Sequence, residues 1–271
     1  MDEKDRQLYE TTLVVESAKQ TAELGKEVIS DVVRPTSKSI GENIGLVVDG
    51  VFGWLGLWGE KQKIKQQKNL DDFKNEINGN LNKIPEKNLK EPTMYIIGPA
   101  IEASKYYYEE DQFKKMFAKL IAASCDDRAT DKISPYFVEA IKQLTPDDAL
   151  ILSLFKAKRR FGTVNYRIAI NDKGESFTYK SFVFYHNSIK TDINSNAVSI
   201  VNLQRIGLIT VDFTKILTDD SNYQSYYKEP IFLQMKKQIK EDTTNKYKNI
   251  HLQKGVVEIT PLGENFIDLC L

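Results

Sequence analysis

Few residues in this sequence have side chains suited to covalent or metal chemistry. The 271 residues include two cysteines and two histidines, placed far apart in the chain at Cys125, His186, His251 and Cys270. A zinc site would need carboxylates to complete its ligand set, and no metal-ligand spacing is present. A Cys125 nucleophile with His186 as its base would need a third group to orient the base, and the sequence indicates none. We therefore predict no catalytic residue, no metal and no cofactor, and expect a protein that is not an enzyme.

Carboxylates gather at one place in the chain. They are Asp126, Asp127, Asp131 and Glu139. Such a group could hold a cation, but no second acidic cluster accompanies it. Aspartates between two helices more often cap helix ends and form exposed turns, which is the interpretation we favour.

Basic residues gather at 156–160 and recur once on a later predicted helix. The candidate nucleic-acid contacts are Lys158, Arg159, Arg160 and Arg205, supported by Lys156, Asn202 and Gln204. Phosphate binding requires clustered Lys and Arg, so this group is the best sequence evidence for DNA recognition. A charge run at a helix end is also typical of a solvated surface that interacts favourably with the helix dipole. We favour the solvated surface and keep nucleic acid as the alternative partner.

Residues 39–59 are apolar and glycine-rich, and only Glu42 and Asp49 are charged. The residues that could make its contacts are Gly50, Phe52, Gly53, Trp54, Leu55, Gly56, Leu57 and Trp58. Glycines permit close packing of helices, whereas tryptophans followed by lysines are typical of a membrane interface. The two acids and the short length argue against a permanent membrane span. We expect the segment to pack against a helix at 8–33 in the resting protein and to contact a membrane only on activation.

Composition sets broad limits on the protein. Lys plus Arg and Asp plus Glu both number 38, so no global field attracts nucleic acid or an anionic membrane. The charged N-terminal residues lack the apolar core of a secretory signal, and the few cysteines fit a reducing cytoplasm. A chain of 271 residues is long enough for two ordinary domains. We predict a cytoplasmic protein that associates with itself or with a protein partner.

Helical periodicity dominates the first half of the chain. We predict helices at 8–33, before Pro85, at 93–111 with an interruption or opening near Pro99, at 111–124, from Ser134–Pro135 and from Thr145–Pro146. In the last of these, Thr145 caps the helix and Asp148 resembles the carboxylate of a capping box.

Alternating β-branched and aromatic residues dominate the second half. We predict a hairpin from 164–170 and 176–186, a helix ending at Gly207 with a short strand after it, a helix at 231–241, a second hairpin turning at Lys254–Gly255, and a last helix opened by Thr260 and Pro261. The tyrosines at 223, 226 and 227 should lie at a core edge or an interface.

This order of elements predicts an α+β, mainly helical fold. Residues 1–144 should form a helical domain, and residues 145–271 a winged-helix-like domain with β-hairpins and insertions. A winged helix can read DNA with the helix before its wing, or can serve in packing and dimerisation. We favour packing because that helix carries Arg205 as its only basic residue.

Several motifs resemble the abortive-infection alpha (Abi-alpha) family of bacterial proteins. They are EP at 91–92, GPAIEA at 98–103, MFAKLIAAS at 116–124, PYFVEAIKQLTPDDA at 135–149, NLQRIGLI at 202–209 and TPLGENFIDLC at 260–270. Family members often carry a His before the proline that corresponds to Pro135, whereas Ser134 stands here. The resemblance implies a role in defence against phage and supplies no catalytic residues. We expect the protein to act by binding, oligomerisation or conditional membrane perturbation, with a winged-helix DNA-binding regulator as the alternative.

Overall fold

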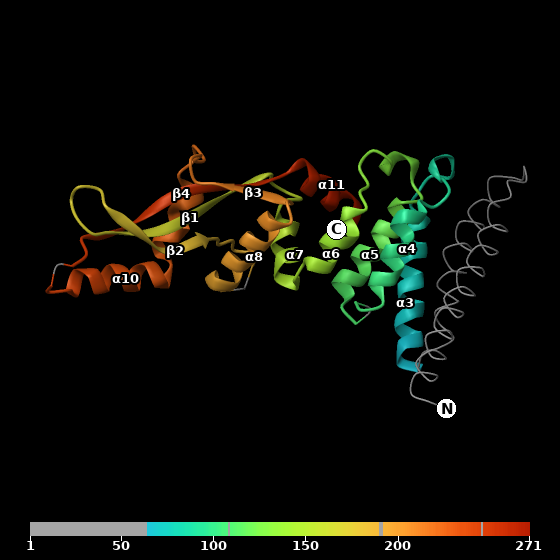
Figure 1. The fold of residues 1–271 in the computed structure, drawn as a ribbon, viewed down its shortest axis with the longest axis horizontal. Coiled ribbons are helices and arrows are strands. Elements are labelled where there is room, and N and C mark those ends of the chain that lie inside the picture. The colour runs from blue at the N-terminus through green and yellow to red at the C-terminus, as the bar shows by residue number, and fades with distance from the viewer. Residues whose placement is uncertain (1–63, 108, 190–191, 245) are drawn as a thin grey trace, which may run out of the picture.

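The structure is a computed structural model that describes residues 64–107, 109–189, 192–244 and 246–271. The predicted helix at 8–33 and the glycine-rich segment at 39–59 lie outside the described residues. The molecule is elongated, with a helical end and a sheet end (Figure 1). No helix among the described residues is long and apolar enough to cross a membrane.

Five helices precede the first strand in the described part of the chain. They are α3 (Ile64–Leu81), α4 (Met94–Ser104), α5 (Asp111–Ala123), α6 (Tyr136–Gln143) and α7 (Pro146–Leu154). The helix predicted before Pro85 is confirmed as α3, and Phe73, Ile77 and Leu81 on its inner face are all buried. α4 is continuous through Pro99, so the predicted opening there is wrong. Burial of Ile96, Ile97, Ala100 and Ile101 on this helix offsets the hydrogen bond that the proline removes.

The remainder of the chain contains all four strands together with further helices. They are β1 (Arg160–Ala169), β2 (Ser176–Val183), α8 (Ile193–Arg205), β3 (Ile209–Asp212), α9 (Ser221–Gln224), the 3-10 turn η3 (Ser225–Lys228), α10 (Pro230–Glu241), β4 (Asn249–Ile259) and α11 (Pro261–Cys270). The mixed α+β class and its greater helical content are therefore confirmed.

Four antiparallel strands form one sheet in the order β2-β1-β4-β3. The predicted first hairpin is confirmed as β1–β2, while the predicted second hairpin is wrong. β4 runs unbroken through Lys254 and Gly255 and pairs with β1 on one side and β3 on the other. Gly255 serves close packing there, because a Cβ atom would lie 2.5 Å from the Phe213 ring.

Predicted helix ends agree with the structure at three places. Thr145 and Asp148 form a complete capping box on α7. Gly207, just after α8, has a φ of +74°, a left-handed conformation that glycine adopts without strain. Thr260 caps α11 by accepting a hydrogen bond from the Gly263 amide at 2.9 Å. At Ser134 the helix begins later than predicted, since α6 starts at Tyr136.

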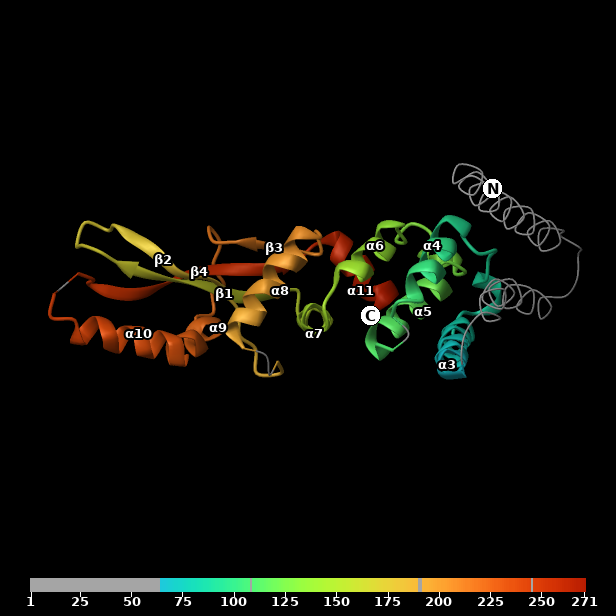
Figure 2. The same cartoon turned by 60° about the horizontal axis from the view of Figure 1, so that its bottom comes forward.

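Two buried clusters make up the core. The larger one runs through α3 to α8 and includes Val257 and Ile259 of β4 and Phe266 of α11. α11 lies between the sheet and α5, which brings the last helix against the helical end (Figure 1). The smaller cluster lies between the sheet and α10, which extends along one sheet face (Figure 2).

Candidate functional site

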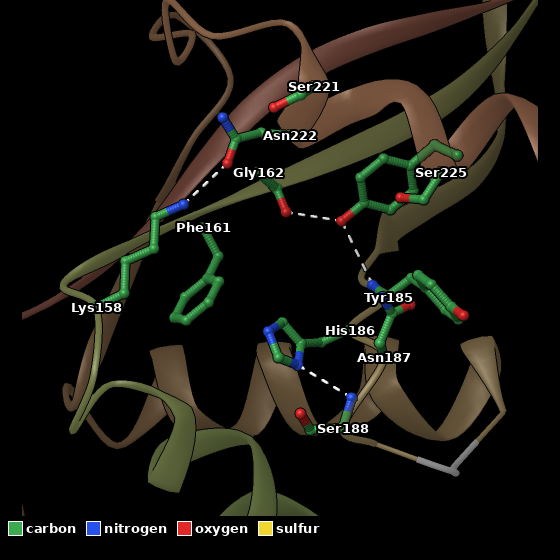
Figure 3. A pocket seen from close by; sticks show the side chains of 11 residues that line it. Lys158, Phe161, Gly162, Tyr185, His186, Asn187, Ser188, Ser221, Asn222 and Ser225 are labelled. Atoms are coloured by element: carbon green, nitrogen blue, oxygen red, sulfur yellow. Dashed lines mark hydrogen bonds between the residues drawn. The ribbon is translucent and has the colours of Figure 1, made fainter.

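A polar pocket lies where the start of β1, the chain after β2 and the α9–η3 segment meet (Figure 3). Its volume is about 520 Å³. The residues that line it, which define the β1–α9 pocket, are Lys158, Phe161, Gly162, Tyr185, His186, Asn187, Ser188, Ser221, Asn222, Ser225 and Tyr226. The pocket thus draws on three chain segments that are far apart in the sequence.

Buried tyrosines fix the frame of this pocket. The Tyr226 hydroxyl donates to the Gly162 carbonyl at 2.7 Å and accepts from the Tyr185 amide at 3.4 Å. The Tyr166 hydroxyl in turn donates to the Tyr226 carbonyl at 2.8 Å. Burial raises the pKa of the Tyr226 phenol, which therefore remains a neutral donor. Tyr223 and Tyr226, which were expected at a core edge or an interface, are both fully buried in the smaller core cluster.

Gly162 allows α9 to approach β1 closely. A Cβ atom at this position would lie 3.0 Å from the Asn222 carbonyl oxygen and 3.0 Å from the Tyr223 ring. Any larger residue would push α9 away from the strand. The wall of the pocket that carries Asn222 therefore depends on glycine at this position.

Lys158 and His186 are the basic side chains in the lining of the pocket. The Lys158 ammonium donates to Asn222 Oδ1 at 2.9 Å and lies 5.5 Å from the centre of the Phe161 ring. His186 Nδ1 accepts a hydrogen bond from the Ser188 amide at 3.2 Å, and its ring packs edge-on against Phe161.

Two effects lower the pKa of His186. Burial contributes most, and the positive charge of Lys158 adds to it. The imidazole is therefore neutral at pH 7, and because Nδ1 is the acceptor, the ring proton resides on Nε2.

The pocket is equipped for polar binding. Its lining combines an ammonium, an imidazole, three serine hydroxyls and two asparagine amides, with aromatic rings beside them. No lining residue is an aspartate or a glutamate. Within this lining, His186 therefore has no carboxylate to orient it as a base.

The predicted basic cluster separates in the structure. Arg159 forms an ion pair with Glu264, and Arg160 forms one with Glu258 at 2.7 Å. Lys156 donates to the Leu271 carbonyl at 3.0 Å, while Lys158 faces the β1–α9 pocket. Because carboxylates neutralise both arginines, the cluster presents less free positive charge than its sequence indicates.

Arg205 has partners on its own helix and on α6. It donates to Gln143 Oε1 at 2.9 Å and to Asn202 Oδ1 at 2.7 Å. Asn202 also donates to the buried Asp148 carboxylate at 2.6 Å. Asn202 therefore contributes to the contact between α7 and α8 and would have to break it to read a base edge.

The exposed face of α8 is partly apolar. Val198 is 68 % exposed and Val201 is 45 % exposed. Asn194 and Arg205 lie on the same side at helical spacing and are also exposed. Apolar side chains exposed at consecutive turns are more typical of a protein contact than of a phosphate-binding surface.

The reactive residues singled out from sequence do not come together. Cys125 is buried in the larger core cluster, His186 lines the pocket and His251 is exposed on β4. Burial raises the pKa of the Cys125 thiol to about 11, and burial also raises that of Cys270.

The aspartate cluster is also dispersed among separate partners. Asp126 accepts from Arg128, Asp127 accepts from Asn88, and Glu139 pairs with Lys142. No group of three or more His, Cys, Asp or Glu side chains arranged for a metal ion occurs among residues the structure describes.

Sequence reasoning named Lys158 and His186 but did not place them together, and it missed the rest of the pocket. Asn187, Ser188, Ser221, Asn222 and Ser225 are polar residues in loops or short turns. Such residues look the same whether they line a pocket or face bulk solvent, so their sequence carries no signal of the site.

Comparison with known proteins gives one informative match. No curated protein matches the chain. A solved structure of an uncharacterized protein from the marine bacterium Alcanivorax borkumensis SK2 aligns with 53 % of this chain and 94 % of its own, at 16 % identity and a TM-score of 0.32. That degree of similarity does not define a common fold. The family model described as abortive infection alpha, in contrast, matches residues 65–270, from the first turn of α3 to the last residue of α11. The motifs quoted above lie within that match, and the chain accordingly belongs to the Abi-alpha family.

Proposed function

We propose that this protein defends bacteria against phage by abortive infection and that it acts through binding rather than catalysis. The family match over residues 65–270 supports the defence role and is the observation on which it rests. Phage challenge of cells that express the chain tests it. We expect fewer plaques and early death of infected cells. Equal plaque counts with and without expression, across a broad phage panel, would contradict the proposal.

The surface of α8 supports action through protein contacts, including self-association. Exposed Val198 and Val201 would lose water-accessible apolar area in such a contact. Replacing both by Glu should abolish protection while leaving the fold intact, because neither side chain is buried. Leu233→Glu is the matched control, since Leu233 is 50 % exposed on the distant α10. If the α8 variant protects as well as the wild type, this surface has no part in defence.

Conditional membrane contact is the second element of the proposal. It rests on the composition of residues 39–59, which lie outside the described part of the chain. In this scheme the protein resides in the cytoplasm and the segment enters the membrane interface after infection. Replacing Trp54 and Trp58 by Ser should then abolish depolarisation of infected cells. If the double mutant protects cells as well as the wild type does, the segment has a packing role only and does not act on the membrane.

The alternative is a winged-helix regulator that binds DNA. It predicts duplex binding that weakens steeply with salt and depends on Lys158, Arg159, Arg160 and Arg205. The ion pairs of Arg159 and Arg160 with glutamates argue against it, because both pairs would have to open. Sequence-selective DNA binding at nanomolar protein concentration, lost when these four residues are replaced by Ala, would favour the DNA-binding regulator over the defence protein as the function.

A further inference from the structure

The β1–α9 pocket has the charge and the donors of a small-anion site. We propose that it binds a small phosphate-bearing ligand, with Lys158 and His186 as the principal contacts of the phosphate. This inference is independent of the defence role, because it concerns what the purified protein binds.

Charge is the first argument. Lys158 is the one fixed cation among the lining residues, and none of them is acidic. Asp219 interacts electrostatically with Lys158, but its carboxylate accepts from the Ser221 amide at 2.9 Å within its own turn. An ammonium has three N–H donors, and the bond to Asn222 uses one. Lys158 can therefore contact an anion without leaving Asn222.

The orientation of His186 is the second argument. Its Nδ1 is held by the Ser188 amide, so the Nε2–H donor points away from that bond, toward the side where Lys158 and Phe161 lie (Figure 3). Both side chains line the same pocket, and the charge of Lys158 contributes to the lowered pKa of the imidazole. An anion between them could accept from the Lys158 ammonium and from His186 Nε2–H, and its charge would favour the protonated form of His186.

Size and surface are the third argument. A volume of about 520 Å³ is within the range of small-molecule sites and exceeds what inorganic phosphate requires. The ring that lies beside Lys158 and His186 is that of Phe161 (Figure 3), and an aromatic ring in the lining can contact a base. The serine hydroxyls and asparagine amides can hydrogen-bond a sugar. Inorganic phosphate and a nucleoside monophosphate are thus the two sources of the phosphate to be distinguished.

Calorimetric titration of the full-length protein tests the phosphate contact. The probes are adenosine monophosphate, inorganic phosphate and adenosine. We expect the phosphate-bearing probes to bind and adenosine to bind far more weakly. Tighter binding of adenosine monophosphate than of phosphate would identify a nucleotide, whereas equal binding would identify the free anion.

Lys158→Gln should weaken binding about 10- to 100-fold, as expected for loss of one charge-assisted hydrogen bond. Lys156→Gln is the matched control, because Lys156 belongs to the same basic run but donates to Leu271 and does not line this pocket. Circular dichroism verifies that both variants fold. No saturable binding of either phosphate-bearing probe, or an equal loss in both variants, would overturn the proposal.

Proton linkage supplies an independent readout. Phe161 packs against His186, and the other titratable side chains of the lining are Lys158, Tyr185 and Tyr226, none of them a carboxylate. A bound anion should therefore raise the pKa of His186, and affinity should increase as the pH falls through that pKa. Sulfate is the suitable probe because it does not titrate near neutral pH.

The protein has two histidines, so NMR of the imidazole signals can follow both. His186→Gln assigns the signals, and His251, exposed on β4, is the internal control. We expect sulfate to move the His186 titration to higher pH and to leave the His251 signal unchanged. Equal responses of the two signals, or no response of His186, would contradict anion binding at this site.

Discussion

Burial changes what the reactive side chains of this protein can do. Cys125 is completely buried, and its thiol pKa of about 11 keeps it protonated at physiological pH. The thiolate is the reactive form, so both the nucleophile and the metal-ligand roles of this cysteine are suppressed. A residue that stands out in the sequence for its chemistry serves here as part of the packing.

We predict that Cys125 resists alkylation in the native protein. With its pKa raised to about 11, the thiolate fraction at pH 8 is about 100-fold below that of an exposed cysteine, and burial blocks access as well. Mass spectrometry after iodoacetamide treatment should detect modification only in denaturant. Rapid native modification of Cys125, with Cys270 unmodified as the buried comparison, would contradict this account.

The candidate site could be predicted from sequence only in part. Lys158 attracts attention as a member of a basic run, and His186 as one of two histidines. That they share a pocket depends on the pairing of β1 with β2 and on the docking of α9 against Gly162. Neither contact leaves a local pattern in the residues involved, because both are formed by segments distant in the chain.

Elements whose boundaries depend on local interactions were the most predictable. The capping box at Thr145 and the left-handed Gly207 involve residues a few positions apart, and both were predicted correctly. The prediction of a turn at Gly255 is wrong, because this glycine lies within β4 and makes room for the ring of Phe213, which follows the end of β3. Pro99 was likewise misread, since burial of the surrounding helix outweighs the lost hydrogen bond.

The capping box on α7 should be a measurable source of stability. Asp148 accepts from the Thr145 amide at 2.7 Å and from Asn202 at 2.6 Å. Asp148→Ala leaves both donors without this acceptor, so we expect the free energy of unfolding to fall by about 2–4 kcal/mol. Asp147→Ala, in the same turn, should cost less than about 0.5 kcal/mol. Urea unfolding followed by circular dichroism compares them, and equal losses would refute the assigned role of the cap.

Two helical glycines should respond in opposite directions to substitution. In α11, a Cβ atom at Gly263 would lie 2.1 Å from the Leu208 carbonyl oxygen, so Gly263→Ala should cost at least about 2 kcal/mol. In α3, Gly79 is exposed with no atom within 4 Å of a built Cβ, so Gly79→Ala should stabilise by about 0.5–1 kcal/mol. Thermal unfolding measures both. A well-tolerated alanine at position 263 would disprove the close approach of α11 to Leu208.

Over the whole molecule, β4 links the two buried clusters. Its residues Val257 and Ile259 belong to the larger cluster and Ile250 belongs to the smaller one. α11 follows β4 directly and places Phe266 against Phe137 of α6, with ring centroids 5.4 Å apart. The helical end and the sheet end are thus joined through the same strand and helix.

This continuity predicts a single cooperative unfolding transition. Phe266→Ala should lower the free energy of unfolding by about 3–5 kcal/mol, and the helices and the sheet should lose structure together. Far-ultraviolet circular dichroism reports mainly the helices, and hydrogen exchange of the β1 and β4 amides reports the sheet end. Two separate transitions would instead support independent domains divided at residues 144 and 145.

β4 is the last strand to be synthesised, although it lies in the middle of the sheet, so the sheet remains incomplete during much of translation. Arg160 of β1 pairs with Glu258 of β4, 98 positions later, so β1 and β2 emerge well before the strand that completes their sheet. β4 ends at Ile259, 76 positions after β2 ends at Val183, so at a synthesis rate of about 5–20 residues per second the hairpin waits for roughly 4–15 s. During that interval β1 has an open edge that carries Val164, Tyr166 and Ile168, and an isolated hairpin is only marginally stable. Crowding of nascent chains therefore favours strand exchange between them, and slow expression at low temperature should increase the folded yield.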